Sequence, residues 1–237
     1  STMREFSSPG DIRFQLSPKI RSADDVLKVD GLSKSYGDNQ LFKDLSFEIF
    51  RGDLIGIIGP NGIGKTTLIK ILFRQISSDS GNMIFGPKVY PGYYSQEGTE
   101  ITFSENETLI DIIREGDISL NDGEIRSLLA KFLFVGDDVF KNASELSGGE
   151  LACVRLALLM ISEANFLLLD EPTNHIDIST KEIIEDALSS YEGTIIAVEY
   201  RKHDRAAMEE NVNKFGLTNV AIVNDASRSS MKGLPVP

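Results

Sequence analysis

The segment from residue 59 to residue 66 constrains the fold of this chain more than any other. It reads Gly-Pro-Asn-Gly-Ile-Gly-Lys-Thr, a full match to the phosphate-binding pattern G-x-x-x-x-G-K-[ST]. Residues 54–58 form an apolar run that predicts a buried strand, and residues 67–72 have the pattern of a helix. A loop between such a strand and helix turns successive backbone N–H groups inward, where they can surround phosphate oxygens. The sequence therefore predicts an α/β fold with a phosphate-binding loop at the end of a strand.

Two side chains of this loop have chemistry of their own. Lys65 can reach the outer phosphates of a nucleotide as a positive point charge, and the Thr66 hydroxyl can bind Mg²⁺. The N-terminus of the following helix adds a partial positive charge. The residues expected to contact the nucleotide here are Gly59, Pro60, Asn61, Gly62, Ile63, Gly64, Lys65, Thr66 and Thr67.

Composition and charge argue against several other classes of protein. No run approaches the ~18 to 20 consecutive apolar residues that a membrane span needs. Residues 1–21 are polar and interrupted by prolines, unlike a signal peptide. The single cysteine, Cys153, cannot form an internal disulfide, and its apolar helical surroundings predict an inert buried thiol. A formal net charge of −12 disfavours general nucleic-acid binding, so no DNA partner is predicted.

Three regions can be distinguished along the chain. Residues 1–25 are predicted to be a linker or arm that is partly disordered, because serine, proline and glycine interrupt any regular pattern there. Residues 26–205 form the predicted main domain, in which strands alternate with helices, and this alternation predicts a mostly parallel sheet. Residues 206–237 are predicted to be an atypical C-terminal segment and tail.

A block at about residues 101–146 departs from the alternation of strands and helices. Ile125, Leu128, Leu129 and Phe132 follow one another at the spacing of one helix face. We expect a helical subdomain inserted into the α/β core. The alternative is a set of further core helices that form no separate unit.

Two adjacent acids follow a second buried strand pattern. Residues 165–169 are almost continuously apolar, as in a parallel strand covered on both faces, and they lead into Asp170 and Glu171. Asp170 can hold the Mg²⁺ shell, and Glu171 can orient or polarise the attacking water. A solvated strand end is the alternative, but the phosphate-binding loop upstream favours the functional interpretation.

A serine and two glycines precede an apolar helix pattern in the middle of the chain. Ser147, Gly148 and Gly149 would open this helix and present another N-terminus that suits phosphate. By itself such a triplet is usually only a turn before a helix. Its place between the phosphate-binding loop and the two acids makes it specific. Further on, Ser179 is predicted to be the N-cap of another helix.

These motifs, in this order, resemble the nucleotide-binding domain of ATP-binding-cassette (ABC) proteins over about residues 26–198. The resemblance implies a P-loop NTPase core of the ABC type, with ATP and Mg²⁺ as ligands. It also implies that Tyr36 stacks on adenine. Ser147, Gly148 and Gly149 would bind the γ-phosphate held by a second, facing domain.

The same resemblance implies the chemistry of the site. The catalytic residues would be Gln96, Glu171 and His203, and the Mg²⁺ ligands would be Thr66, Gln96 and Asp170. Asp177 would lie in a loop that crosses the interface between two domains.

Residues 171–177 narrow the resemblance further. They read Glu-Pro-Thr-Asn-His-Ile-Asp, which is similar to a string of the F subfamily, whose members are soluble tandem ATPases that bind ribosomes. The implied partners are a second ABC domain, in tandem or as a homodimer, and the ribosome, and the implied location is the cytoplasm. Two alternatives stay open. One is the ATPase subunit of a membrane transporter, with a membrane subunit as partner, and the other is an ATP-dependent interaction module with slow hydrolysis.

One segment departs from the family pattern. The family carries a switch histidine just after the last core strand, and Tyr200 occupies that position here. A histidine followed by Asp-Arg arrives only at His203. Either a local insertion brings His203 to the γ-phosphate, or the switch histidine is absent.

Overall fold

A central β-sheet organises the molecule. The computed structural model describes residues 16–59, 62–95, 98–99, 103–104, 106–200 and 219–222. Within these ranges the sheet has six strands in the order β6-β5-β7-β8-β3-β9, all parallel except that β6 runs antiparallel to β5. Its strands are β3 (Leu54–Gly59), β5 (Pro91–Ser95), β6 (Gly98–Thr99), β7 (Phe166–Asp170), β8 (Thr194–Tyr200) and β9 (Asn219–Ile222). The predicted parallel α/β core is confirmed.

Strand β7 shows why the sheet is buried on both faces. Alternate residues of a strand point to opposite faces. Leu167 and Leu169 belong to a hydrophobic cluster with helix α4 (Gly148–Ile161). Phe166 and Leu168 belong to a second cluster with helix α1 (Lys65–Leu72). A continuous apolar strand is therefore required here, because each face is covered by a helix.

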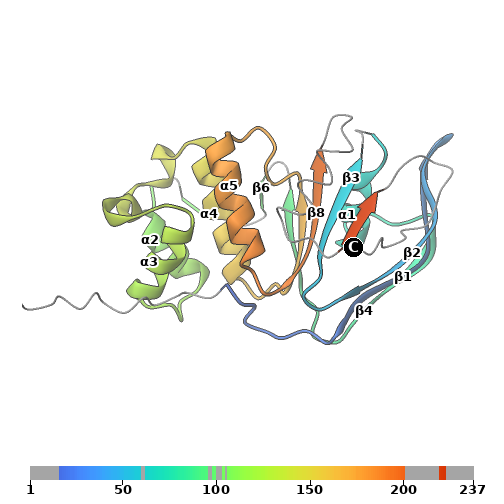
Figure 1. Cartoon of the computed structure of the whole chain (residues 1–237), viewed down its shortest axis with the longest axis horizontal. Helices are drawn as coiled ribbons and strands as arrows, with labels where there is room; N and C mark the ends of the chain where they lie inside the picture. The colour runs from blue at the N-terminus through green and yellow to red at the C-terminus, as the bar shows by residue number, and fades with distance from the viewer. Residues whose placement is uncertain are drawn as a thin grey trace, which may run out of the picture.

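A second, antiparallel sheet lies at one end of the molecule, at the right of Figure 1. It has the order β2-β1-β4, with strands β1 (Asp25–Tyr36), β2 (Asn39–Phe50) and β4 (Ser80–Phe85). Strands β1 and β2 form a hairpin whose turn contains Gly37 at φ 57°, a conformation that glycine adopts without strain. The sequence analysis did not predict this separate sheet.

The helical block lies at the opposite end of the molecule, in green at the left of Figure 1. It contains α2 (Leu109–Gly116), α3 (Asp122–Lys131) and two short 3-10 helices, η1 (Gly136–Phe140) and η2 (Ala143–Glu145). The predicted stripe on α3 is confirmed, because Ile125, Leu128, Leu129 and Phe132 are all buried. These residues share one hydrophobic cluster with α4, so the block packs on the core through that helix.

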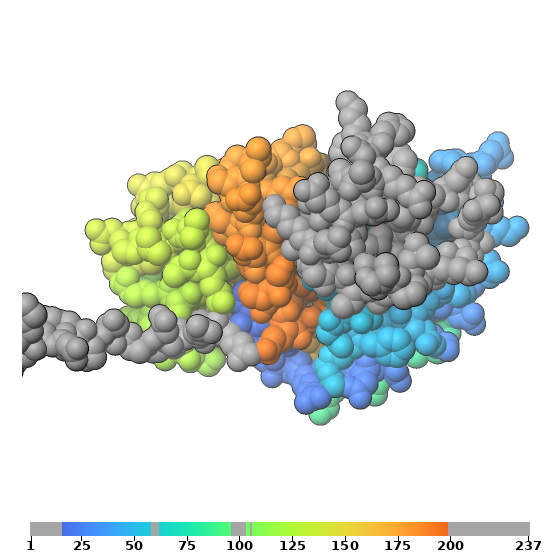
Figure 2. Space-filling model, in the orientation of Figure 1, coloured from blue at the N-terminus to red at the C-terminus, as the bar shows by residue number. Residues whose placement is uncertain are grey.

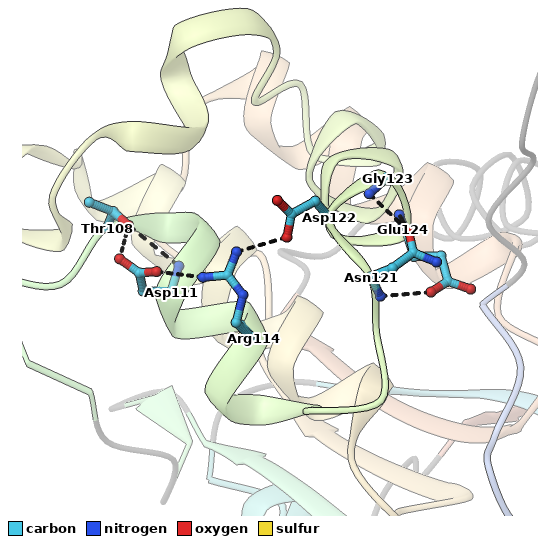
Figure 3. A network of polar contacts seen from close by, with 7 residues as sticks. All are labelled: Thr108, Asp111, Arg114, Asn121, Asp122, Gly123 and Glu124. Carbon is cyan, nitrogen blue, oxygen red and sulfur yellow. Dashed lines mark hydrogen bonds and ion pairs between the residues drawn. The ribbon is translucent and has the colours of Figure 1, made fainter. Parts of the chain in front are cut away.

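Polar contacts connect α2 to the start of α3, as Figure 3 shows. The Arg114 guanidinium bridges Asp111 of its own helix, at 2.7 Å, and Asp122 at the start of α3, at 2.9 Å. Asn121 caps α3 in a reciprocal arrangement with Glu124. Thr108 caps α2 by accepting a hydrogen bond from the Asp111 N–H, so both helix starts are held by side chains instead of depending on propensity alone.

The segment before β1 packs against the helical block and against the residue that precedes β7. Residues 1–25 are predicted to be a linker or arm that is partly disordered, and the structure describes this stretch from Leu16 onward. Leu16 is only 1% exposed and sits in the cluster shared by the helical block and α4. Lys19 pairs with Asp117 at the end of α2, at 3.0 Å, and Asn165 donates a hydrogen bond to the Ile20 carbonyl at 2.9 Å. The domain boundaries themselves stay a prediction.

Helix α5 (Ile178–Ser189) crosses the face seen in Figure 2, in orange between the helical block and the blue and cyan strands. Its N-cap is Asp177, whose side chain accepts a hydrogen bond from the Thr180 N–H at 2.9 Å. The predicted cap at Ser179 is wrong by two positions. Aspartate and serine are both good caps, so composition alone could not separate them.

No helix in the described ranges combines the length and the apolar character that a bilayer crossing requires.

Candidate functional site

The carboxyl ends of three neighbouring strands meet at one edge of the parallel sheet. Strand β8 pairs with β7 and with β3, so that Asp170 lies opposite Val198, and Gly59 lies opposite Tyr200. Open α/β sheets bind ligands at this edge, because the loops that leave parallel strands gather there. The fold thus places the end of β7 near the phosphate-binding loop, although more than a hundred residues separate them in sequence.

Two glycines of the loop have backbone conformations that favour glycine. Gly62 has φ 84° and Gly64 has φ 101°, values that side chains rarely tolerate. A Cβ on Gly64 would also stand 2.9 Å from Cβ of Leu41, at the start of β2. Glycine is therefore needed at position 64 for both its backbone angle and its packing. Pro60 and Asn61 lie outside the described residues.

Lys65 is a buried cation at the first turn of α1. Lys65 is only 6% exposed. Burial lowers the pKa of the Lys65 ammonium, while the carboxylates of Glu171 and Asp170 oppose this change. A cation held in such a place gains free energy from an anionic ligand that replaces lost water. The surroundings of Lys65 therefore suit a phosphate.

Thr66 and Asp170 form the centre of the site. The Thr66 hydroxyl donates a hydrogen bond to Oδ1 of Asp170 at 3.0 Å, and the Tyr93 hydroxyl reaches Oδ2 at 3.4 Å. Asp170 is 3% exposed, and burial raises the pKa of its carboxyl against the opposing effect of these two hydrogen bonds.

A hydroxyl beside a carboxylate is the donor set that Mg²⁺ uses in nucleotide sites, with phosphates and water as its other ligands. Within the described residues no group of three or more histidine, cysteine or acidic side chains could hold a metal by itself. Thr66 and Asp170 therefore fit a cation that the nucleotide helps to bind, and they do not resemble a self-sufficient metal centre.

Glu171 leaves the sheet in a turn. Its N–H still donates to the Val198 carbonyl of β8 at 2.9 Å, but its own φ is 52°, in the left-handed region. Asn174 donates from Nδ2 to Oε2 of Glu171 at 2.8 Å. The carboxylate is thus anchored through its backbone on one side and through Asn174 on the other.

The Ser-Gly-Gly motif opens α4 as predicted. Ser147 is the N-cap, and it exchanges hydrogen bonds with Glu150 in a capping box of 3.2 and 2.8 Å. Oγ of Ser147 accepts in this box, so its proton can still be donated to an anion. A Cβ on Gly148 would meet nothing within 4 Å, whereas one on Gly149 would stand 3.1 Å from Thr180. The motif therefore adjoins the start of α5 and leaves Gly148 on an open surface.

Asp177 lies beside Gly149 and Thr180, at the start of α5. Hydrogen bonds from Ser179, and then from the backbone and hydroxyl of Thr180, hold the pKa of its carboxyl well below the usual range. Its cap on α5 gives it a structural role within the domain. The proposed contact across an interface stays a prediction.

Tyr36 ends β1 with its ring 55% exposed. Lys34 places its ammonium 5.2 Å from the ring centroid and is itself tied to Asp79 at 2.9 Å. Leu41, in β2 of the same hairpin, lies against Gly64 of the phosphate-binding loop. An exposed ring at the end of β1 is compatible with stacking on a base.

Some expected site residues cannot be placed. Gln96 follows β5 directly but lies outside the described residues, as does His203. The register of β8 brings the backbone at Tyr200 beside Gly59, the first residue of the loop. Cys153 is buried, and burial raises the pKa of its thiol to about 12, as expected for an inert cysteine.

Sequence reasoning missed two supporting residues. Tyr93 reaches Asp170 from the neighbouring strand, and only the sheet order brings the two together. Asparagine is common in turns, which is the one signal at Asn174, but that signal does not predict its bond to the Glu171 carboxylate.

Comparison with known proteins independently supports the resemblance to ABC nucleotide-binding domains. A family model described as ABC transporter matches residues 42–174. The protein named YdiF of Bacillus subtilis (strain 168) is 46% identical over 187 residues, which are 78% of this chain and 28% of YdiF. The energy-dependent translational throttle protein EttA of Escherichia coli (strain K12) is 38% identical over 195 residues, 80% of this chain and 34% of EttA.

The fold has a close structural counterpart as well. A bacterial Atm1-family ABC exporter with ATP bound superposes with a TM-score of 0.65 over 87% of this chain and 38% of that one, at 20% identity. This likeness concerns the fold alone. The chain spans about a third of the length of the curated relatives it matches, 28% of one and 34% of the other.

Proposed function

This chain belongs to the ABC transporter family, as a nucleotide-binding domain of the ABC-F type, and from that premise we propose that it binds and hydrolyses Mg²⁺–ATP together with a second such domain. The observation that carries the proposal is the hydrogen bond of 3.0 Å between Thr66 and Asp170. It joins the phosphate-binding loop to the end of β7 and creates the donor pair that a nucleotide-bound cation needs.

Each residue of this group has a proposed task. The backbone of the loop and Lys65 bind the phosphates, and Thr66 and Asp170 hold Mg²⁺, which would neutralise charge on the phosphates. Glu171 accepts a hydrogen bond from the attacking water and draws off its proton. Tyr36 stacks on the base. Gln96 and His203 are proposed to contact the water or the γ-phosphate.

A complete site needs a second domain. Ser147 and the two glycines after it adjoin Asp177 and Thr180, not the Thr66–Asp170 pair. We therefore assign this motif to the ATP of a facing domain, and the same motif of that domain to the ATP bound here. The openness of Gly148 supports this arrangement, because an exposed helix N-terminus can approach an anion on another chain.

The proposed cellular role, in translation, rests on the names of the relatives. EttA is named as an energy-dependent translational throttle protein. We propose that the parent protein acts in the cytoplasm on the ribosome, where ATP closes the two domains and hydrolysis lets them open. A transporter subunit is the rival proposal.

Co-sedimentation tests this role. We expect a Glu171→Gln chain to pellet with purified ribosomes in ATP but not in ADP, because a closed domain pair persists when hydrolysis is blocked. Lys65→Ala in the same background is the control and should stay in the supernatant. Pelleting that does not depend on nucleotide would count against the role, and recovery of a multispanning membrane protein in a pull-down would favour the transporter.

A slow ATP-dependent clamp is a second candidate, and the register of β8 favours it. Position 200, beside Gly59, carries tyrosine where a switch histidine is expected. On this reading Tyr200→His should raise steady-state ATP turnover by about tenfold or more, and His203→Ala should change nothing. A brisk wild-type ATPase that collapses in His203→Ala would instead assign the switch to His203.

A further inference from the structure

The turn that follows β7 holds the Glu171 side chain at two points. The Asn174 N–H donates to the Glu171 carbonyl at 3.1 Å, which closes the turn. Asn174 Nδ2 donates to Oε2 of the Glu171 carboxylate at 2.8 Å. The same residue therefore fixes both the backbone of Glu171 and the direction of its carboxylate.

The turn is strained, which suggests that the hydrogen bond between the Asn174 amide and the Glu171 carboxylate has a functional role. Glu171 has φ 52° and His175 has φ 59°, two side-chain-bearing residues in the left-handed region on either side of Asn174. Such conformations are unfavourable for residues that carry a Cβ, and they persist where the surroundings over-determine them. Strain of this kind gathers at sites where the position of a side chain matters for function.

We propose that Asn174 is a positioning residue for hydrolysis: its amide holds Oε2 of Glu171, so that Oε1 remains directed to the attacking water. The inference rests on the proposed function, in which Glu171 takes the proton of that water. Asn174 does not itself touch the reacting atoms.

The Asn174 side chain has the length needed to reach the Glu171 carboxylate. Glu171 has three side-chain torsions, and its carboxylate can rotate unless one oxygen is held. The amide of Asn174 reaches Oε2 from three residues away while its backbone closes the turn. A serine hydroxyl is shorter by one atom, and an alanine has no donor, so the two substitutions grade the contact.

The contact also has a rival interpretation that makes an opposite prediction. A hydrogen bond could keep Glu171 away from the water and act as a latch. Removing the Asn174 amide would then raise turnover, whereas a positioning residue requires turnover to fall.

The test measures single-turnover ATP hydrolysis and ATP affinity for Asn174→Ala and Asn174→Ser, each in the wild-type and the Glu171→Gln background. Asn82→Ala is the matched control, because Asn82 is an exposed asparagine on β4, away from the site. We expect Asn174→Ala to lower the single-turnover rate constant by about 10- to 100-fold, with the ATP dissociation constant within about twofold of the wild-type value. Asn174→Ser should fall between Asn174→Ala and wild type, and Asn82→Ala should match wild type.

The double variant separates positioning from a general loss of structure. If Asn174 acts through Glu171, adding Asn174→Ala to Glu171→Gln should not slow hydrolysis further, because the group being positioned is already gone. Losses that multiply would overturn the inference, and so would an Asn174→Ala chain that is as fast as wild type or faster. A wild-type chain no faster than Glu171→Gln would overturn the proposed hydrolysis itself, and the inference with it.

Discussion

Glu171→Gln is expected to reduce ATP turnover by about 10²- to 10⁴-fold while ATP affinity stays nearly unchanged. The amide keeps the size and most of the shape of the carboxylate but is a poor acceptor of the water's proton. The binding groups, Lys65, Thr66 and Asp170, are untouched, and the Thr66–Asp170 hydrogen bond remains in place. Steady-state release of phosphate, together with titration of ATP, checks both parts of the expectation.

The same variant should convert ATP into a dimerisation signal. Each domain contributes only part of a site, so the chain should be monomeric without nucleotide and dimeric when ATP is bound and not hydrolysed. Light scattering measures the change in mass directly. Gly148→Asp in this background should abolish the dimer, since its carboxylate would repel the γ-phosphate of the facing domain.

The surroundings of Gly148 make this variant a clean probe. A Cβ at this position meets nothing within 4 Å, so the substitution should not disturb the domain itself. Gly148→Ala is the matched control and should dimerise, which separates the added charge from the loss of glycine. Absence of any ATP-dependent change in mass would contradict pairing between identical chains and would leave a non-identical partner domain as the required arrangement.

Lys65→Ala should weaken ATP binding far more than AMP binding. Hydrogen bonds to charged groups contribute about 1.5–3 kcal/mol, and a loss of this size corresponds to about 10- to 150-fold in affinity. The buried position of Lys65 and its lowered pKa place it among groups that gain most from an anion. AMP lacks the outer phosphates, so its affinity should change little.

Tyr36→Ala provides the matched contrast in the same titrations. Its exposed ring would contact the base, which ATP and AMP share, and aromatic stacking contributes about 1 kcal/mol. Both nucleotides should therefore lose a similar, small amount of affinity. Equal losses of ATP and AMP in Lys65→Ala would contradict the assignment of the phosphate-binding loop.

The sequence by itself determined the local parts of this protein. A glycine pattern between a strand and a helix fixed the loop around Gly64, because its φ of 101° excludes almost every other residue. The continuous apolar run before Asp170 predicted a strand covered on both faces, and the stripe on α3 predicted its buried side. Each of these features depends on neighbours within a few residues, which is why a linear pattern is enough to find them.

Only the tertiary structure decided which of these parts meet. The order of the parallel strands brings Asp170 to Thr66 and places Tyr93 beside it, and no spacing along the chain encodes that approach. The separate sheet of β1, β2 and β4 and the packing of Leu16 into the helical block likewise follow from contacts between distant segments. The burial of apolar surface drives the packing of such segments and is non-directional, so the shape of the whole fold decides which polar side chains then meet.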